Sequence, residues 1–331
     1  MTDTALVVGE ALIDIVQHEG QALGEHVGGS PLNVAVGLAL LGRRVEFLTW
    51  IGDDRRGRRV ADYLHDSGVD LAEGSVGASR TATARAELDE KGSATYQFDI
   101  EWQLSPNPGL TAPLVLHTGS IATALEPGCD AVAELIDANA ATSTISFDPN
   151  IRSVFFEDAE EALSRMETVV TRSDVVKASD EDMRWLDPHS SPEELAARWL
   201  TLGPSIVAVT FGAHGSFAIC ADGDERIPAY PAEVVDTVGA GDAFMTGLID
   251  ALWDLGLLGG HRRGQLHDIG AAVLREVLKV AALSAALTVA RPGAALPDRA
   301  TRDQAANRLT EDCTVRILLL AQPFPPLSGT T

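Results

Sequence analysis

Cysteine is scarce in this chain of 331 residues, which contains three. Cys129, Cys220 and Cys313 lie far apart and form no C-x-x-C pair, so the sequence predicts neither a zinc site nor a disulfide framework. Free thiols are typical of a reducing cytosol. The first four residues also lack the basic region of a signal peptide. We therefore expect a cytoplasmic protein.

Positive charge and long apolar runs are also in short supply. Lys and Arg number 25 against 48 Asp and Glu, which gives a formal net charge of -23. Nucleic acids need a basic binding surface, so the composition argues against that class of partner. No uncharged apolar run reaches about 18 residues, so no membrane span is predicted. Apolar residues still make up 45% of the chain, enough for one large α/β domain with a small accessory element.

Short apolar runs alternate with helical patterns along most of the chain, which predicts parallel βαβ units. The expected strands are 5–9, 45–51, 114–117, 143–147, 174–177 and 205–211. The expected helices include 31–41, 57–67, 128–141, 192–202 and 271–289.

Two regions break this rhythm. Residues 81–88 and 94–100 alternate with a period of two around a turn at 89–92, which predicts a hairpin. It could form a lid or extend the edge of the main sheet. We expect one domain over 1–309, with lid segments at about 12–30 and 80–103. The tail, 310–331, contains a strand-like run at 315–321, and we assign it no function.

The most informative segment is Asp236-Thr237-Val238-Gly239-Ala240-Gly241-Asp242, between a strand-like run at 227–235 and a predicted helix. Glycine lets the backbone approach a ligand, and N–H groups at a helix start bind anions. We expect the backbone of Gly239, Ala240 and Gly241 to bind a transferred phosphoryl group and Asp242 to act as a base. The alternative is an ordinary glycine-rich loop before a helix.

The string D-T-x-G-A-G-D-x-F resembles the signature of the ribokinase-like (PfkB) carbohydrate kinases, and the similarity spans about residues 5–297. The resemblance implies an α/β fold: a three-layer Rossmann-like domain with a mainly parallel sheet, plus a small β-sheet lid. It also implies ATP and Mg²⁺, with K⁺ as a further hypothesis, a small-molecule sugar as acceptor, and a homodimer formed through the lid. An NAD-dependent oxidoreductase is disfavoured because no G-x-G-x-x-G follows the first strand.

The resemblance assigns one group of residues to the sugar. Gly28 and Gly29 would let it lie against the backbone, while Asn33 and Asp14 would bind its hydroxyl groups. Alternatively, Asn33 caps the following helix and Asp14 is an exposed turn residue.

A second group follows the strand at 143–147, in the string Asp148-Pro149-Asn150-Ile151-Arg152. Asn150 and Arg152 are assigned to the substrate, together with Phe98 of the hairpin. A guanidinium group can hold a substrate oxygen or the phosphoryl group, although Arg152 could also be a surface charge.

The remaining assignments concern the nucleotide and cations. Lys177, Thr210, Gly212 and Gly215 would bind ATP together with Gly239 and Gly241. Ser179 and Asp182 occupy the register in which many relatives carry N-x-x-E, so Asp182 or its neighbour Glu181 would contact Mg²⁺ through water. Asp236 and Val238 match the region that binds a monovalent cation in many relatives.

Three strings resemble those of fructokinases most: G-E-x-L-I-D near the start, D-P-N-x-R, and Glu101-Trp102. They imply phosphorylation of a primary hydroxyl group of fructose. A 2-keto-3-deoxygluconate kinase, a ribokinase and a nucleoside kinase remain alternatives. From a different class, the chain could be a regulator that binds sugar or nucleotide without catalysis.

Overall fold

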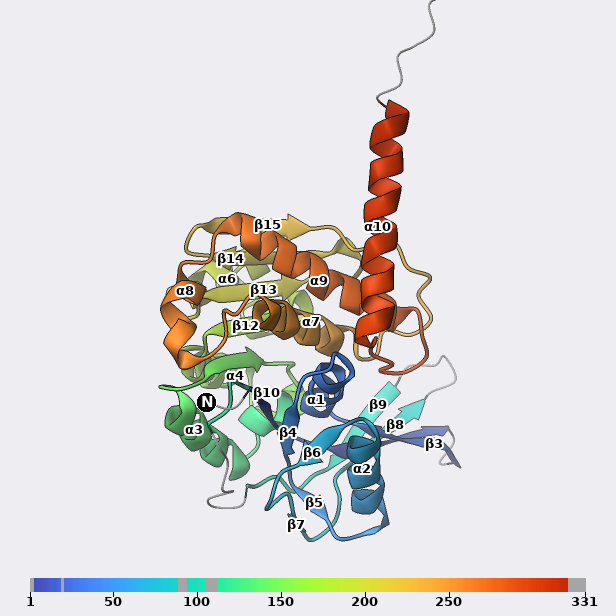
Figure 1. Cartoon of the computed structure of the whole chain (residues 1–331). Coiled ribbons are helices and arrows are strands. Elements are labelled where there is room, and N and C mark those ends of the chain that lie inside the picture. The colour runs from blue at the N-terminus through green and yellow to red at the C-terminus, as the bar shows by residue number, and fades with distance from the viewer. Residues whose placement is uncertain (1–2, 19–20, 89–93, 105–111, 321–331) are drawn as a thin grey trace, which may run out of the picture.

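The computed structural model describes residues 3–18, 21–88, 94–104 and 112–320. Its main feature is a nine-stranded sheet (Figure 1). The sheet is parallel from β6 to β13, and β14 and β15 extend it in antiparallel fashion. In spatial order its strands are β15 (Gly223–Ile227), β14 (Ser216–Cys220), β13 (Ile206–Thr210), β12 (Val175–Ser179), β11 (Thr144–Asp148), β10 (Val115–Gly119), β1 (Ala5–Val8), β4 (Val45–Leu48) and β6 (Val69–Leu71).

Helices cover both faces of this sheet and enclose two apolar cores. Neighbouring strand residues point to opposite faces, so Val7 joins one core and Leu6 the other. The first core contains residues of α1 (Ser30–Leu40), α2 (Arg55–Asp66), α7 (Ala240–Asp254), α8 (Arg263–His267) and α9 (Ala271–Val289). The second contains residues of α3 (Gly128–Asn139), α4 (Ala159–Val170), α5 (Asp180–Leu186) and α6 (Pro192–Leu200). The result is the predicted three-layer α/β fold.

Four strands form a second, smaller sheet beside the main one (Figure 1). Their order is β3 (Gln21–Gly28), β2 (Leu12–His18), β8 (Thr83–Leu88) and β9 (Ala94–Asp99). The predicted hairpin is confirmed as the antiparallel pair β8 and β9, and its turn at 89–92 lies outside the described residues. Because these strands form their own sheet, the alternative of an edge extension of the main sheet is wrong. A further short parallel pair joins β5 (Ile51–Gly52) and β7 (Val76–Ala78).

Local capping explains where two helices begin. Asp54 accepts hydrogen bonds from the backbone N–H groups of Arg56 and Gly57, so α2 starts at Arg55 rather than at the predicted residue 57. At α5, Ser179 and Asp182 form a reciprocal capping box. Single turns of 3₁₀ helix complete the fold: η1 (Ser120–Thr123), η2 (Ser153–Phe155), η3 (Gly212–His214) and η4 (Gly260–Arg262).

Two predicted strands are wrong. β15 ends at Ile227, and residues 228–239 form a connection in which Val234 and Val235 are exposed. The run at 315–321 is helical through Leu320, because α10 (Arg299–Leu320) has no Gly or Pro to end it and crosses the domain boundary expected at residue 309. No helix among the described residues is long and apolar enough to cross a membrane.

Candidate active site

The candidate site lies at one edge of the main sheet, where the carboxyl ends of its central parallel strands meet the first turns of α1 and α7. Glu10 follows β1, Ser120 follows β10, Asp148 ends β11, and Lys177 lies in β12. In open α/β sheets this edge is where ligands bind.

Asp242 lies in the first turn of α7 and is buried. The hydroxyl of Ser30 donates a hydrogen bond to its Oδ1 at 2.7 Å. The side-chain amide of Asn33 donates to its Oδ2, also at 2.7 Å. The residue that precedes α1 is Gly29 and no side chain caps this helix, so the alternative that Asn33 is a helix cap is wrong. Ser30 was not among the predicted site residues, although it directly follows Gly29.

The glycine-rich turn before α7 has the geometry that its sequence predicts. Gly239 adopts a left-handed φ of 77°, and a Cβ there would lie 2.6 Å from the Cβ of Ala294, so a larger residue would be strained and crowded. Ala240 begins the helix, and its N–H makes a 3.3 Å bond to the carbonyl of Thr237. The next N–H groups, beginning with Gly241, belong to the first turn, where the helix itself supplies no acceptor.

A buried ion pair stands directly behind this turn. Lys177 Nζ lies 2.8 Å from Asp148 Oδ2, and also 2.8 Å from the position that a Cβ on Gly241 would occupy. Burial lowers the pKa of Lys177, but Asp148, Asp242 and Asp182 outweigh it, so the pKa is raised and the ammonium stays charged. Burial raises the pKa of Asp148 to about 6, although Lys177 counteracts it. Asp148 is a second residue of this site to which no role was predicted.

The predicted sugar residues lie in the smaller sheet, which we call the lid, at the start of α1 and after β11. Asp14 lies in β2, so the alternative of an exposed turn residue is wrong. Its Oδ2 occupies the space above Gly28, where a Cβ would lie 2.1 Å away. Burial raises the pKa of Asp14, and the nearby Arg152 opposes this shift. Arg152 is partly buried and donates from Nη1 to Asn150 Oδ1 at 2.7 Å, while Asn150 has a left-handed φ of 36°.

Phe98 connects the lid to the body of the protein. Its ring packs against Phe155 of η2 with a centroid distance of 5.3 Å. Both rings lie against a small apolar cluster that includes Leu12, Ala84 and Ile121. This cluster joins β2 and β8 of the lid to η1, which follows β10, and so it holds the lid over the same edge of the sheet.

Three further residues predicted to bind nucleotide lie at the end of β13, the strand next to β12, and in the turn that follows it. Thr210 ends β13, and η3 follows it. Gly212 and Gly215 have left-handed φ values of 52° and 93°. A Cβ on Gly215 would lie 2.1 Å from the carbonyl oxygen of Ile227, so this close approach requires glycine.

The predicted Mg²⁺ residues have protein partners or face outward. Asp182 accepts from the backbone N–H of Ile151 at 3.0 Å and from the hydroxyl of Ser179 at 2.7 Å. Glu181 is exposed. Within the described part of the chain, no three His, Cys, Asp or Glu side chains are grouped as a metal site.

The predicted K⁺ region is a pair of adjoining turns. Asp236 accepts from the backbone N–H of Val238 at 3.0 Å and from that of Gly293 at 2.8 Å. These bonds lower the pKa of Asp236, so it stays ionised. The side chain of Val238 itself is exposed.

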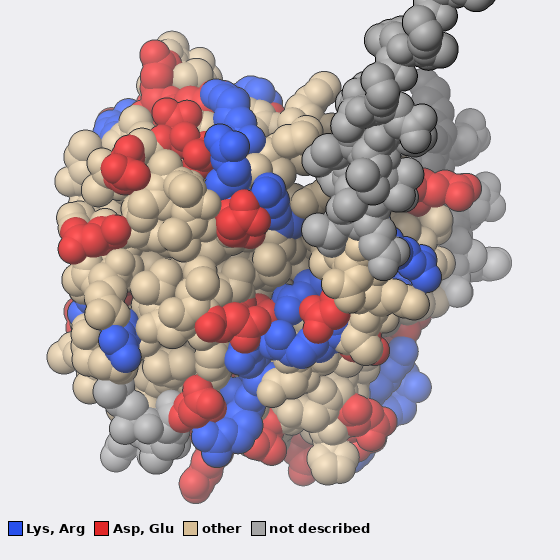
Figure 2. Space-filling view, turned by 45° about the horizontal axis from the view of Figure 1, so that its top comes forward, with Lys and Arg blue, Asp and Glu red and all other residues tan. Residues whose placement is uncertain are grey.

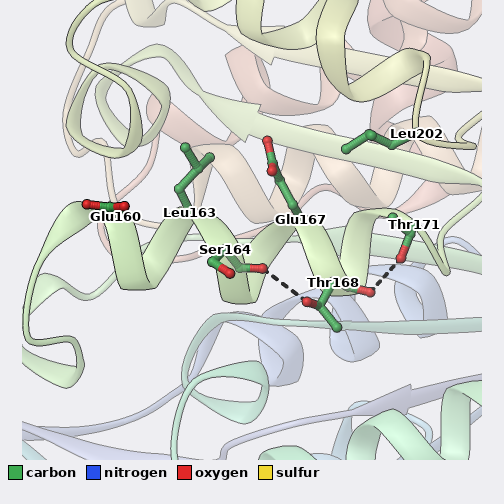
Figure 3. A pocket seen from close by; sticks show the side chains of 7 residues that line it. All are labelled: Glu160, Leu163, Ser164, Glu167, Thr168, Thr171 and Leu202. Carbon is green, nitrogen blue, oxygen red and sulfur yellow. Dashed lines mark hydrogen bonds between the residues drawn. The ribbon is translucent and has the colours of Figure 1, made fainter.

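Other surface features do not contain these residues. A shallow groove on the outer side of α4 is lined by Glu160, Leu163, Ser164, Glu167, Thr168, Thr171 and Leu202 (Figure 3). On the face shown in Figure 2, acidic and basic side chains lie side by side.

Comparisons with known proteins agree on the family and on the fold. The family described as pfkB family carbohydrate kinase matches residues 2–301. A fructokinase of Rhizobium leguminosarum bv. trifolii is 35% identical over 260 residues, which cover 75% of this chain and 79% of that protein. The crystal structure of a fructokinase from Xylella fastidiosa with bound ATP has a TM-score of 0.83 at 26% identity, covering 94% of this chain and 100% of that one. A double mutant of the fructokinase from Vibrio cholerae O395, in a form with fructose, ADP and potassium ion bound, has a TM-score of 0.77 at 28% identity, covering 91% and 97%.

Proposed function

The chain belongs to the pfkB family of carbohydrate kinases, and from that premise we propose that it transfers the γ-phosphoryl group of ATP to a primary hydroxyl group of fructose. The observation that carries the proposal is the position of Asp242. It lies in the first turn of α7, after the left-handed Gly239, and contacts Asn33 of α1. Fructose is favoured as the acceptor because the fructokinases are 31–35% identical to this chain.

We assign Asp242 as the base that takes the proton of the attacking hydroxyl group. Its carboxylate is bound by neutral donors, Ser30 and Asn33, rather than by a cation in direct contact. Asn33 uses one of its amide hydrogens for Asp242, which leaves the other hydrogen and the carbonyl oxygen for sugar hydroxyl groups. Asn33 can therefore hold the acceptor and the base in one geometry, which is what proximity catalysis requires.

The transferred phosphoryl group would lie against the turn Gly239–Gly241. The first-turn N–H groups of α7 and the positive end of the helix dipole favour an anion there. Lys177 adds a charge from behind Gly241, and its bond to Asp148 holds it in place. Thr210, Gly212 and Gly215 would approach the rest of the nucleotide from β13 and η3. The left-handed conformations of Gly212 and Gly215 let the backbone come close to the nucleotide.

The remaining sugar contacts would come from the lid side. We propose that Asp14 accepts from sugar hydroxyl groups, with Gly28 and Gly29 against the ring. Arg152, held by Asn150, would bind a substrate oxygen on the opposite side. Phe98 would close the apolar edge of the site, because its packing on Phe155 ties the lid to the body.

ATP-dependent phosphoryl transfer needs a divalent cation, and the residues present fit Mg²⁺ held through water. Mg²⁺ keeps several waters and takes few protein ligands. Oδ2 of Asp182 accepts from both the hydroxyl and the backbone N–H of Ser179, whereas Oδ1 accepts from the backbone N–H of Ile151 and has a second lone pair that can accept from a metal-bound water. Glu181 would contact the outer shell. When bound, the ion would neutralise phosphate charge.

We further propose that K⁺ binds beside the joined turns of Asp236, Val238 and Gly293. The proposal is supported by the potassium ion in the Vibrio cholerae relative and by the two bonds that order Asp236. Turnover measured with and without KCl tests it. A higher rate with KCl than with an equal concentration of choline chloride is expected, and equal rates would contradict it.

We propose one kinase domain over 1–309 with the lid inserted, a cytoplasmic location, and a homodimer formed through the lid. The dimer is supported by the sheet order, which leaves β3 and β9 as edge strands. Analytical ultracentrifugation should show twice the monomer mass, and a monomer at micromolar concentration would contradict the dimer.

The function is tested by ADP release with ATP and Mg²⁺ over a panel of acceptors. The panel contains fructose, 2-keto-3-deoxygluconate, ribose, adenosine and fructose phosphates. A preference for fructose in kcat/KM is expected. Preference for another acceptor would keep the kinase mechanism but change the assigned substrate. Sugar binding without turnover would identify a regulator instead.

A further inference from the structure

Asp148 is a buried carboxylate with partners on two sides of the candidate site. It ends β11 and is 1% exposed. Its backbone lies in close contact with β10, because a Cβ on Gly119 would lie 1.9 Å from the carbonyl oxygen of Asp148. Its two carboxylate oxygens accept hydrogen bonds from different segments, Lys177 of β12 and Asn150 of the loop after β11. The carboxylate therefore stands between two separate partners.

One carboxylate oxygen, Oδ2, holds Lys177. The ammonium Nζ donates to it at 2.8 Å, and both side chains are buried. The same Nζ lies 2.8 Å from the position that a Cβ on Gly241 would occupy. Gly241 belongs to the turn proposed to bind the transferred phosphoryl group. Because a lysine side chain is long and flexible, a fixed acceptor is needed to keep its charge behind that turn.

The other oxygen, Oδ1, holds the loop that carries Arg152. The backbone N–H of Asn150 donates to it at 3.2 Å, and Asn150 has the left-handed φ of 36°. This conformation is unusual for a residue other than glycine, so it needs support from its surroundings. Arg152 Nη1 in turn donates to Asn150 Oδ1 at 2.7 Å. The orientation of the guanidinium group therefore depends on Asn150, and that of Asn150 on Asp148.

A second carboxylate supports the same loop from α5. Asp182 Oδ1 accepts from the backbone N–H of Ile151 at 3.0 Å, so two successive N–H groups of the loop are bound by buried or partly buried carboxylates. Among the described residues, Lys177 makes its hydrogen bond to Asp148 and not to Asp182. Asp148 is thus the carboxylate that contacts both the lysine and the loop.

We propose that Asp148 is a positioning residue that serves both the phosphoryl side and the sugar side of the site. Oδ2 keeps the ammonium of Lys177 behind the phosphoryl-binding turn, and Oδ1 keeps the loop of Asn150 in the conformation from which Arg152 reaches the sugar. This inference rests on the proposed function, which places the phosphoryl group at that turn and the sugar at Arg152. Asp148 should therefore affect kcat through one oxygen and the KM for fructose through the other.

Asp148→Asn separates the two roles, because an asparagine side chain has one acceptor oxygen where the carboxylate has two. That oxygen should pair with Lys177, since hydrogen bonds to a charged group are the stronger ones, and the N–H of Asn150 then loses its acceptor. In steady-state kinetics the KM for fructose should rise about 10-fold. The kcat should fall about 10-fold, because Lys177 loses its ionic partner.

Removing the lysine as well should restore the sugar side. In Asp148→Asn/Lys177→Met the amide oxygen has no ammonium to bind and can accept from Asn150 again. The KM for fructose should return to within about threefold of that of the unaltered protein, while kcat stays at least about 10-fold lower. A purely structural role for Asp148 predicts no such recovery.

A second pair of variants covers the case in which Asp148→Asn does not fold. Asp148→Ala/Lys177→Met also removes both charges of the ion pair, which is milder than removing one, but it leaves no acceptor for Asn150. Its KM for fructose should be about 10-fold higher than that of Asp148→Asn/Lys177→Met. Equal KM values for these two double variants would overturn the inference.

Asp174→Asn is the matched control. Asp174 is a buried carboxylate at the opposite end of the same two strands, where it precedes β12, accepts from the backbone N–H of Ile145 in β11 and pairs with Arg263. Its kcat and KM for fructose should stay within about threefold of those of the unaltered protein. An equal rise in KM for this control, an unchanged KM for Asp148→Asn, or no recovery in Asp148→Asn/Lys177→Met would overturn the inference.

The failure of the inference is distinguishable from that of the function. If the unaltered protein phosphorylates none of the acceptors in the panel, the function and the inference fall together. If another acceptor is preferred to fructose, the same comparison is made with the KM for that acceptor. If the unaltered protein is active but one of the contradicting results is observed, the kinase function stands and only the role of Asp148 is wrong.

Discussion

Helix α7 carries two buried aspartates two turns apart, and they are held in opposite ways. Asp242 in the first turn is bound by the neutral side chains of Ser30 and Asn33. Asp250 is 0% exposed and is bound by three arginines: Arg43, which follows α1, and Arg299 and Arg302 of α10. Residues of α1 therefore bind Asp242, whereas the segment after α1 and helix α10 bind Asp250.

The difference teaches what each contact is for. Three guanidinium groups around Asp250 neutralise its charge and link α7 to the segment after α1 and to α10, so loss of this carboxylate should cost stability. Neutral donors at Asp242 orient the carboxylate without cancelling its charge, which is what the proposed base requires.

The largest expected effect comes from replacing Asp242, the aspartate that neutral side chains bind. Asp242→Asn keeps the shape and both neighbouring donors but removes the base, so kcat should fall about 10²–10⁴-fold. The free energy of unfolding should change little. Steady-state kinetics and urea unfolding on the same preparation check both statements, and turnover within a few-fold of the unaltered protein would contradict the role.

The second prediction concerns Asp250, the aspartate that three arginines bind. Asp250→Asn leaves three arginines with an uncharged partner, so the free energy of unfolding should fall by about 3 kcal/mol. Asp254→Asn is the control, because Asp254 shares Arg43 and Arg299 but is half exposed. Its loss should cost less than about 1 kcal/mol. Equal losses for the two variants in urea unfolding would show that burial of the cluster does not matter.

A third prediction concerns Glu10, whose pKa is raised by burial from 4.5 to about 7. The folded state holds this proton more tightly than the unfolded state, so the stability it confers is present below pH 4.5 and is lost as pH rises through 7. The Glu10→Gln variant has no such titrating group. The difference in the free energy of unfolding, variant minus unaltered protein, should therefore rise by about 2 kcal/mol between pH 5 and pH 8.

Glu25→Gln supplies the control of opposite sign. The side chain of Arg56 lowers the pKa of Glu25, so the stability from Glu25 is present above pH 4.5 and is lost as pH falls through its lowered value. Unfolding curves over pH 3–8 measure both variants. A Glu10→Gln profile parallel to that of the unaltered protein would contradict the account of Glu10.

The smallest effect sharpens the role of the neutral donors. Asn33→Ala removes one donor from Asp242 and the proposed contact to the sugar, so the KM for fructose should rise about 10-fold. Asn33→Asp tests the charge, since a second carboxylate beside Asp242 should be worse than alanine. If alanine changes neither KM nor kcat, Asn33 only fills space.

Local patterns predicted the parts of the site that local sequence controls. The glycine turn before Asp242 needs a left-handed residue, and Gly239 is one. The strand predicted at 227–235 was wrong. Its valines have high strand propensity, but Val234 and Val235 lie exposed in a connection.

Contacts between distant segments could not be predicted in this way. Ser30 meets Asp242 and Arg43 meets Asp250 across more than 200 residues, and no periodicity encodes such a pair. The burial of Glu10 likewise depends on segments that follow β10 and begin α1. A signal was present at Ser30, since it lies between Gly29 and Asn33, which were both assigned to the sugar, but its partner was visible only in three dimensions.

The most direct test of the central claim is the identity of the product. The protein should be incubated with ATP, Mg²⁺ and fructose, and the mixture followed by phosphorus NMR with proton coupling. We predict one sugar phosphate per ADP, whose signal is split into a triplet by the two protons of a CH₂ group. A doublet would place the phosphate on a secondary hydroxyl group, and ADP with inorganic phosphate alone would contradict sugar kinase activity.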